Sequence, residues 1–171
     1  MQQDPQSVDG KGQSIAKLPY GVSLKPLTTH VDQRGSLFEM FASHWDWSDS
    51  PFAYAYCFTV RPNIVKGWGY HKKHEDRYCM MFGELLVVLY DEREDSPTKG
   101  LVSEVFLSEY NRCLLNIPAG IWHADQNIGN KDAVVVNFPT RHYDHLEPDK
   151  YRLPIDTDRI PYTFKFAKGG G

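Results

Sequence analysis

A histidine follows a tight turn in the stretch between Pro118 and Asn127, with the spacing Pro-x-Gly-x-x-His-x-x-x-Asn. Pro118 fixes φ and Gly120 tolerates positive φ, so this spacing predicts a sharp turn. His123 then leaves the turn in extended conformation and directs its imidazole at whatever the sheet encloses. Such an imidazole can hydrogen-bond a substrate, act as a base or bind a metal; the alternative is a structural histidine whose ring nitrogens are satisfied.

A second histidine, His71, lies in the segment Lys66-Gly67-Trp68-Gly69-Tyr70-His71-Lys72. If Gly69 faces the interior of a barrel, His71 faces it too, because side chains alternate along a strand. His71 is then suited to act as a base near neutral pH, with an unperturbed pKa near about 6.5. The alternative is a structural histidine bonded to a barrel carboxylate. His74 has the opposite parity and charged neighbours, so we expect it in a solvated loop.

The elements that position these histidines are predicted to be strands. Short β-branched and aromatic runs separated by turn residues indicate strands, and the clearest are Tyr54–Val60, Arg77–Phe82, Leu85–Tyr90, Leu101–Leu107, Cys113–Ile117 and Ala133–Phe138. Short helices are expected only within Ser36–Trp47 and after Tyr143. Many short strands at even spacing favour a sandwich or barrel, so the predicted class is all-β with short peripheral helices.

Length and composition predict one domain over residues 17–166, since 171 residues with 41% hydrophobic content can bury a core. Residues 1–16 are polar and are predicted to form a disordered tail, and residues 167–171 a flexible one. A net charge of −3 gives no electrostatic case for nucleic acid or for an anionic membrane. The longest apolar run, Leu85–Tyr90, is too short to cross a bilayer.

The expected location is the cytoplasm. The N-terminus shows no apolar segment typical of a secretory signal. Cys57, Cys79 and Cys113 are odd in number and lack paired spacing, which predicts buried thiols in a reducing compartment.

Several ordered fragments resemble the dTDP-4-dehydrorhamnose 3,5-epimerase family, a group of cupin jelly-roll barrels. Asp32–Glu39 is similar to the family's Asp-x-Arg-Gly-x-Phe-x-Glu, and Val65–Tyr70 to its Leu-Arg-Gly-Leu-His-Tyr/Phe segment. The Pro118–His123 turn is similar to its second cupin motif, and the resemblance runs from Thr28 to about Tyr162. It implies a cupin jelly-roll barrel, a nucleotide-linked 4-keto-6-deoxysugar as substrate, and a homodimer.

The family's proton machinery is replaced at every position. A histidine takes a proton beside the sugar carbonyl, a tyrosine supplies one to the other face, and an aspartate orients the histidine. The histidine position falls on Gly69, the tyrosine position on Asn137, and the aspartate has no counterpart here. The related sugar 3,4-ketoisomerases carry Arg-Gly-x-His-x-His-Lys at the first place, and His71 matches their second histidine. The resemblance thus implies His71, His123 and the late Tyr143 as catalytic residues.

Substrate contacts are also implied by the resemblance. Arg34 and Glu39 occupy positions that in the family meet the nucleotide across a dimer interface; the alternative for Arg34 is a surface salt bridge with Asp32. Lys66 replaces an arginine that contacts diphosphate or sugar, and Asn137, if inward, can hydrogen-bond the ligand. Tyr56, with Tyr54, stands where the family has polar ligand contacts. The aromatic residues that line either a pocket or a dimer seam are Trp45, Trp47 and Phe52.

We therefore expect an epimerase- or isomerase-like cupin that needs no cofactor, because the sugar carbonyl serves as the electron sink. One alternative is a cupin that binds sugar nucleotides without catalysis. A further alternative is a metal-dependent cupin enzyme on another small molecule, with a divalent metal at His71 and His123.

Overall fold

The computed structural model of the chain describes residues 3–45, 52–165 and 168–170. These described ranges form thirteen strands: β1 Ser23–Pro26, β2 Thr29–Asp32, β3 Gly35–Phe38, β4 Tyr56–Val60, β5 Ile64–Tyr70, β6 Asp76–Phe82, β7 Glu84–Asp91, β8 Val102–Ser108, β9 Cys113–Ile117, β10 Ile121–Asn127, β11 Ala133–Asn137, β12 Tyr151–Arg152 and β13 Lys168–Gly170. The described residues contain no helix, so none can span a membrane.

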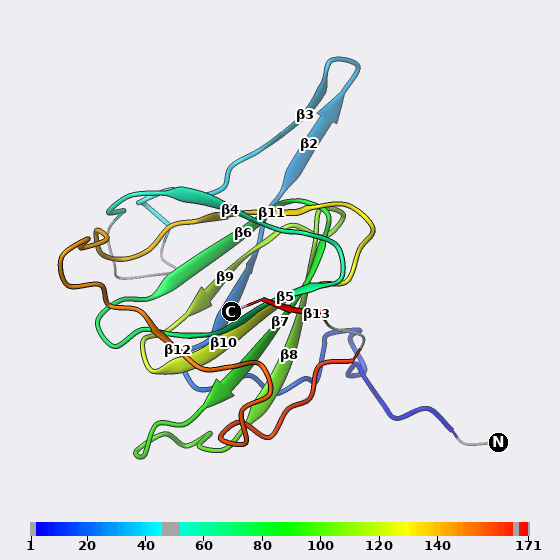
Figure 1. Cartoon of the computed structure of the whole chain (residues 1–171). Coiled ribbons are helices and arrows are strands. Elements are labelled where there is room, and N and C mark those ends of the chain that lie inside the picture. The colour runs from blue at the N-terminus through cyan, green and yellow to red at the C-terminus, as the bar shows by residue number, and fades with distance from the viewer. Residues whose placement is uncertain (1–2, 46–51, 166–167, 171) are drawn as a thin grey trace.

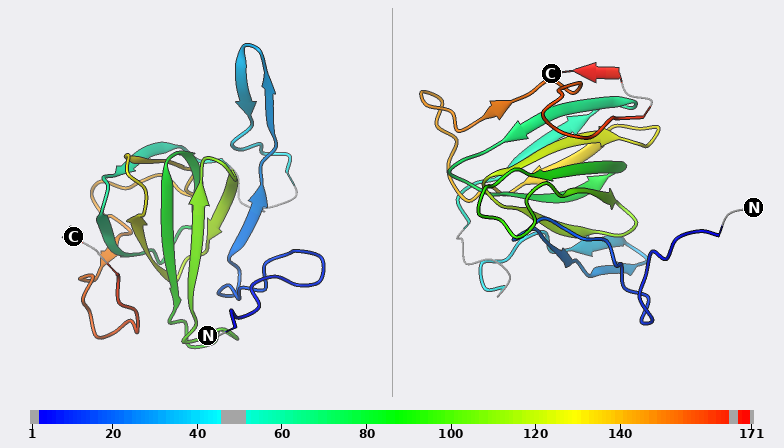
Figure 2. Two further views of the ribbon diagram at one scale, coloured as in Figure 1. Left: turned by 90° about the vertical axis from the view of Figure 1, so that its right-hand side faces the viewer. Right: turned by 90° about the horizontal axis from the view of Figure 1, so that it is seen from below.

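Two antiparallel sheets face each other and enclose the core (Figures 1 and 2). One has the order β1-β9-β6-β11-β4, and the other has the order β12-β5-β10-β7-β8, with β13 parallel to β5 at its margin. Strands distant in sequence lie side by side, since β10 pairs with both β5 and β7. This arrangement is the cupin jelly roll that the resemblance implied, and the all-β prediction is confirmed.

The second sheet is covered on both faces. Along β7, Leu85, Val87 and Leu89 join the core between the sheets, whereas Leu86 and Val88 pack on the opposite side. The chain after β12 covers that outer side with Leu153, Ile155, Ile160, Tyr162 and Phe164. Strands β7 and β10 are therefore apolar or buried on both faces, whereas β8 alternates strictly between buried and exposed residues.

The β2–β3 hairpin projects from the body of the barrel (Figures 1 and 2). The sequence predicted a short helix over Ser36–Trp47, and this prediction is wrong for the part the structure describes. Asp32 accepts a hydrogen bond from the Arg34 backbone N–H, and Gly35 adopts a φ of +140°, so the chain reverses into β3. Residues 46 and 47 lie outside the described residues, so the predicted pocket or dimer role of Trp47 is not tested.

Helices after Tyr143 are likewise not found among the described residues. The segment from residue 144 to residue 165 forms turns and the short strand β12. Pro148, Pro154 and Pro161 interrupt it, and its apolar residues are used to cover the second sheet.

The six strands predicted from the sequence are all present, with ends that differ by at most two residues. One correction concerns the thiols: Cys79 is buried and Cys113 half-buried, but Cys57 is exposed because β4 is an edge strand. The predicted domain limits and the two tails remain predictions.

Candidate active site

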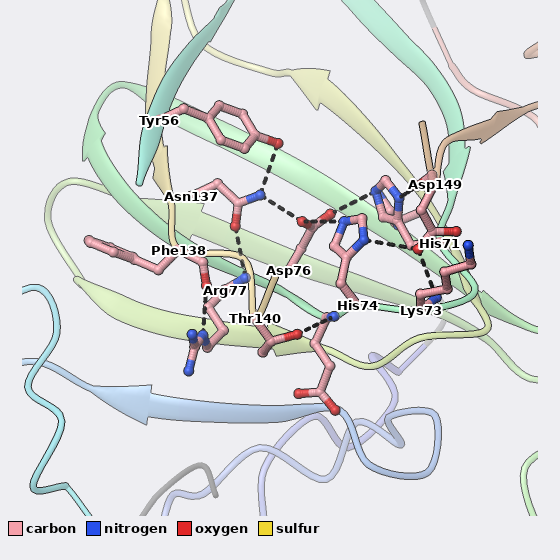
Figure 3. A network of polar contacts seen from close by, with 12 residues as sticks. Tyr56, His71, Lys73, His74, Asp76, Arg77, Asn137, Phe138, Thr140 and Asp149 are labelled. Atoms are coloured by element: carbon pink, nitrogen blue, oxygen red, sulfur yellow. Dashed lines mark hydrogen bonds and ion pairs between the residues drawn. The ribbon is translucent and has the colours of Figure 1, made fainter. Parts of the chain in front are cut away.

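A buried carboxylate, Asp76, lies at the centre of a polar cluster inside the barrel (Figure 3). It is the first residue of β6 and is 2% exposed. Its side chain points inward because it shares the parity of Tyr78 and Met80, which both belong to the enclosed core. A carboxylate in this place needs partners, since an unpaired buried charge is costly.

Two imidazoles converge on one oxygen of this carboxylate. His71 Nε2 lies 3.2 Å from Asp76 Oδ2, and His123 Nε2 lies 3.5 Å from the same atom. The two rings are 5.5 Å apart between centroids. His74 approaches the other oxygen, Oδ1, at 3.8 Å.

Asn137 holds Asp76 from the other side. Its amide Nδ2 donates to Asp76 Oδ1 at 2.7 Å and to the Tyr56 hydroxyl at 3.0 Å. Its Oδ1 accepts the backbone N–H of Arg77 at 2.8 Å. Every polar group of the Asn137 side chain is therefore engaged, and the orientation of the Asp76 carboxylate is fixed.

The Pro118–Gly120 turn sets the place of both histidines. Gly120 has a φ of +85°, as the spacing predicted, and its N–H donates to the His71 carbonyl at 2.8 Å. His123 follows on β10 and is 6% exposed. The turn thus aims one imidazole inward and ties down the backbone of the other.

Gly69 makes room for His123. The two residues are opposed in the register of β5 and β10, and a Cβ on Gly69 would lie 3.1 Å from His123 Nε2. The imidazole of β10 therefore occupies the space into which a side chain at position 69 would extend.

Asp149 fixes the loop that carries His71 and His74. Its carboxylate accepts the backbone N–H groups of Lys72 at 2.9 Å and Lys73 at 2.7 Å, and it accepts His74 Nδ1–H at 2.9 Å. Its backbone carbonyl accepts Nδ1–H of His71. His74 packs against His71 with 4.0 Å between ring centroids, so the expected solvated position of His74 is wrong.

The two central histidines differ in charge. Burial opposes the charged form of His71, but the hydrogen bonds to Asp76 and to the Asp149 carbonyl outweigh it and raise its pKa. Both ring nitrogens of His71 face oxygen acceptors, which favours its charged form, and the unperturbed pKa expected for His71 is corrected upward. Burial lowers the pKa of His123 to about 4 in spite of Asp76, so this imidazole is neutral near pH 7.

Asp76 is ionised between them. Burial alone would raise its pKa, but the hydrogen bond and charge of His71, with the contributions of His123 and Asn137, hold it well below the usual value. Burial, followed by the charge of His71, lowers the pKa of His74. The cluster therefore combines an ionised carboxylate with one imidazole, His71, whose charged form is favoured, and two, His74 and His123, whose neutral form is favoured.

The predicted catalytic residues separate into two places. His71 and His123 meet at Asp76, but Tyr143 lies farther out, 42% exposed, with its ring against His145. It lines a cavity of about 220 Å³ together with Lys73, His74 and Asp149. Tyr143 therefore borders the loop side of the cluster.

The predicted substrate-binding residues also divide. Tyr56 and Asn137 join the cluster, and Lys66 lies on β5 with its ammonium 4.3 Å from the Phe58 ring centroid. Arg34 stands in the hairpin turn, largely exposed and paired with Asp32 as the alternative interpretation expected.

Glu39 follows the hairpin and lines a cavity of about 400 Å³ at the hairpin base with Lys25, His30 and Trp45. Within one chain, the structure does not bring Arg34 or Glu39 to His71 and His123.

The sequence did not lead us to name Asp76, Asp149 or Asp125 as a site residue. Asp76 stands among charged residues that resemble a surface loop, although it also opens an apolar strand with inward parity. Asp125 is two residues from His123 on β10 and shares its parity, which is a usable signal. Asp149 gave no local signal, because its partners are about 75 residues away.

Among the residues that the structure describes, two groups of side chains could act as metal ligands. His71, Asp76 and His123 present three ligand atoms within 4.8 Å of one another, and His71, His74 and Asp149 do the same. Nitrogen and carboxylate donors of this kind suit zinc or iron. The first group contains the two histidines named for the metal alternative.

An antiparallel double-sheet barrel that encloses a buried histidine–aspartate cluster is the architecture of a cupin enzyme. The sequence model of the polysaccharide biosynthesis C-terminal domain family matches residues 30–151. The chain belongs to this family.

Two curated relatives extend over most of the chain. It is 36% identical over 138 residues to a probable low-salt glycan biosynthesis epimerase of Haloferax volcanii, covering 80% of this chain and 88% of the relative. It is 33% identical over 144 residues to the spore coat polysaccharide biosynthesis protein SpsL of Bacillus subtilis, covering 84% and 95%.

Solved structures agree with this class. A dTDP sugar isomerase from Desulfovibrio desulfuricans is 30% identical with a TM-score of 0.78, over 86% of this chain and 94% of that one. A dTDP-4-dehydrorhamnose 3,5-epimerase from Sulfolobus tokodaii is 26% identical with a TM-score of 0.73, over 90% and 88%. The similarity to 3,5-epimerases and sugar isomerases is confirmed, and the chain is an enzyme of the epimerase and isomerase class.

Proposed function

We propose that this protein removes a proton from a carbon beside the carbonyl of a nucleotide-linked 4-keto-6-deoxysugar and returns one to the same or a neighbouring carbon, as an epimerase or isomerase. The observation that carries the proposal is the meeting of two imidazoles at one buried carboxylate, Asp76: His123, whose neutral form is favoured, and His71, whose charged form is favoured. A base and an acid held side by side are what carbanion chemistry next to a carbonyl requires. The names of the epimerase and isomerase relatives support the substrate class.

The steps follow from the charges. The sugar carbonyl acidifies the neighbouring C–H bond, and His123 Nε2 accepts that proton while the bonding electrons move to the carbonyl oxygen as an enolate. Asp76 stabilises the imidazolium formed on His123, as a carboxylate does beside a catalytic histidine. His71, already protonated, donates to the enolate oxygen or to the adjacent carbon. No cofactor enters, because the carbonyl is the electron sink.

The nucleotide is assigned to Arg34 and Glu39, and the sugar to Lys66, Tyr56 and Tyr143. Asn137 contributes by holding Asp76 and the Tyr56 hydroxyl. A hairpin that projects from its own barrel is suited to reach the barrel of a second copy, which supports the homodimer (Figure 2). Arg34 can then leave Asp32 and bind phosphate oxygens in pairs. Three free cysteines fit a reducing, cytoplasmic location.

The test is proton NMR of the protein with dTDP-4-keto-6-deoxyglucose in D₂O. The signal of one proton beside the carbonyl should disappear, and His123→Asn should slow that loss by about 100-fold or more. His44→Asn removes an exposed histidine and should exchange at the wild-type rate.

The other outcomes identify the alternatives. Unchanged sugar signals with broadened nucleotide signals would mean binding without catalysis. Exchange that stops with a chelator and returns with a divalent cation would assign a metal to His71, Asp76 and His123. Neither exchange nor broadening would overturn the sugar-nucleotide proposal.

A further inference from the structure

Asp125 carries a buried carboxyl group that the proton chemistry above does not use. On β10, Ile121 belongs to the core between the sheets, whereas Trp122 and Ala124 pack on the outer side. His123 and Asp125 therefore both face the enclosed side. Asp125 is 4% exposed, and its Oδ1 has no hydrogen-bond partner among the residues that the structure describes.

The inward parity distinguishes Asp125 from other buried groups without partners. Three further side-chain atoms within the described ranges lack one: Trp68 Nε1, Arg112 Nε and Asn116 Oδ1. Trp68 packs in the outer cluster, and Asn116 has the opposite parity to Leu115 and Ile117 of the core. Asp125 alone of these four stands on the inward face of the strand that carries His123.

A cationic side chain, Lys66, stands opposite Asp125 without bonding its Oδ1. The β10–β5 register shifts between His123 and Asp125, and the shift places Asp125 opposite Lys66. The ammonium of Lys66 lies over the Phe58 ring, 4.3 Å from its centroid. Burial raises the pKa of Asp125 to about 7; the charges of Lys66 and Lys150 oppose this rise and that of Asp76 adds to it.

A buried oxygen acceptor without a donor destabilises the folded protein, and a ligand that supplies the donor relieves that cost. We propose that Asp125 accepts a hydrogen bond from a ring hydroxyl of the bound sugar and, with Lys66 beside it, decides which sugars the site accepts. A hydroxyl suits this place because it is neutral: the ionised Asp76 nearby would repel a carboxylate or phosphate. This inference rests on the proposed function and adds a specificity-determining contact to it.

The experiment measures dissociation constants by calorimetry for dTDP-6-deoxyglucose, whose 4-hydroxyl in place of the ketone prevents reaction. Its 2-deoxy and 3-deoxy analogues each lack one hydroxyl. Wild-type protein should bind one of the two analogues about 10- to 100-fold more weakly than the parent, because that analogue leaves Asp125 without a donor.

Three variants separate a contact from a structural role. Asp125→Leu removes the acceptor at similar size and should bind the parent and both analogues equally, with a melting temperature no lower than wild type. Asp125→Asn keeps a weaker acceptor and should retain about a tenth to a third of the wild-type ratio between the dissociation constants of the analogue and the parent. If the leucine variant does not fold, this asparagine variant provides the test. Asp132→Asn removes an exposed carboxylate on the following loop and should match wild type.

The failures are distinguishable. If wild-type protein binds none of the three ligands, the proposed function is overturned. If it binds them with equal affinity, or if Asp125→Leu keeps the wild-type discrimination, only the assignment of Asp125 is wrong.

Discussion

The pH dependence of stability in an Asp125→Asn variant tests the electrostatics of the barrel interior. Burial raises the pKa of Asp125 from 3.8 to about 7. The unfolded chain therefore releases this proton near pH 4, whereas the folded protein keeps it until about pH 7. As pH rises between these values, the carboxyl group makes folding progressively less favourable.

The magnitude follows from the difference between the two pKa values. The pKa difference is about 3, and a difference of one pKa unit corresponds to about 1.4 kcal/mol. Asp125 therefore lowers the free energy of unfolding by about 4 kcal/mol at pH 8 relative to pH 4. Asparagine has similar shape and no ionisation. The variant should therefore match wild type near pH 4 and exceed it by about 4 kcal/mol at pH 8.

The assay is urea unfolding of both proteins at constant ionic strength, from pH 4.5 to pH 8. Only the difference between the two proteins is interpreted, because His123 has the opposite effect in the same range. Its pKa of about 4 lies below the ordinary 6.5, so it adds stability as pH rises toward 6.5. A difference that stays constant within about 0.5 kcal/mol across the range would show that Asp125 is ionised at little cost, and would refute the argument.

Three further variants address the cluster around Asp76. Asp76→Asn leaves the His71 imidazolium without its buried counter-charge, so we expect about 3–5 kcal/mol loss of stability by urea unfolding and a lowered His71 pKa by NMR titration. Gly69→Ala places a methyl group 3.1 Å from His123 Nε2, so it should displace the imidazole and lower the free energy of unfolding by about 1–3 kcal/mol. It should also slow the exchange of the substrate proton with solvent. Unchanged exchange would contradict the close fit of His123 against position 69. Asp149→Ala frees the backbone of the His71 loop and should lower kcat more than it raises KM, which steady-state kinetics with the 4-keto sugar would measure.

The sequence was sufficient where local chemistry sets the outcome. The Pro118–Gly120 turn and the inward direction of His123 follow from φ preferences and strand alternation. Asp76 was missed because its neighbours in sequence are charged, while its burial depends on β5, β10 and β11 closing around it. The hairpin of β2 and β3 was missed for a related reason, since one Asp32 hydrogen bond and one left-handed glycine decide between a hairpin and a short helix.

The strand register shows which side chains lie near the positions where the 3,5-epimerases carry their catalytic histidine, aspartate and tyrosine. Position 69 lacks an imidazole, but the opposing residue on β10 is His123, and its ring fills that space. The late aspartate is absent, but Asp76 supplies a carboxylate from β6 at hydrogen-bonding distance to His71. Asn137 stands where a tyrosine is expected and fixes that carboxylate through Nδ2. Because a barrel brings inward faces of several strands to one place, the same donor and acceptor types can come from different strands. Under the proposed function, the substitutions keep the groups needed for proton transfer while changing their positions around the sugar, and the expected result is a change in which carbon reacts.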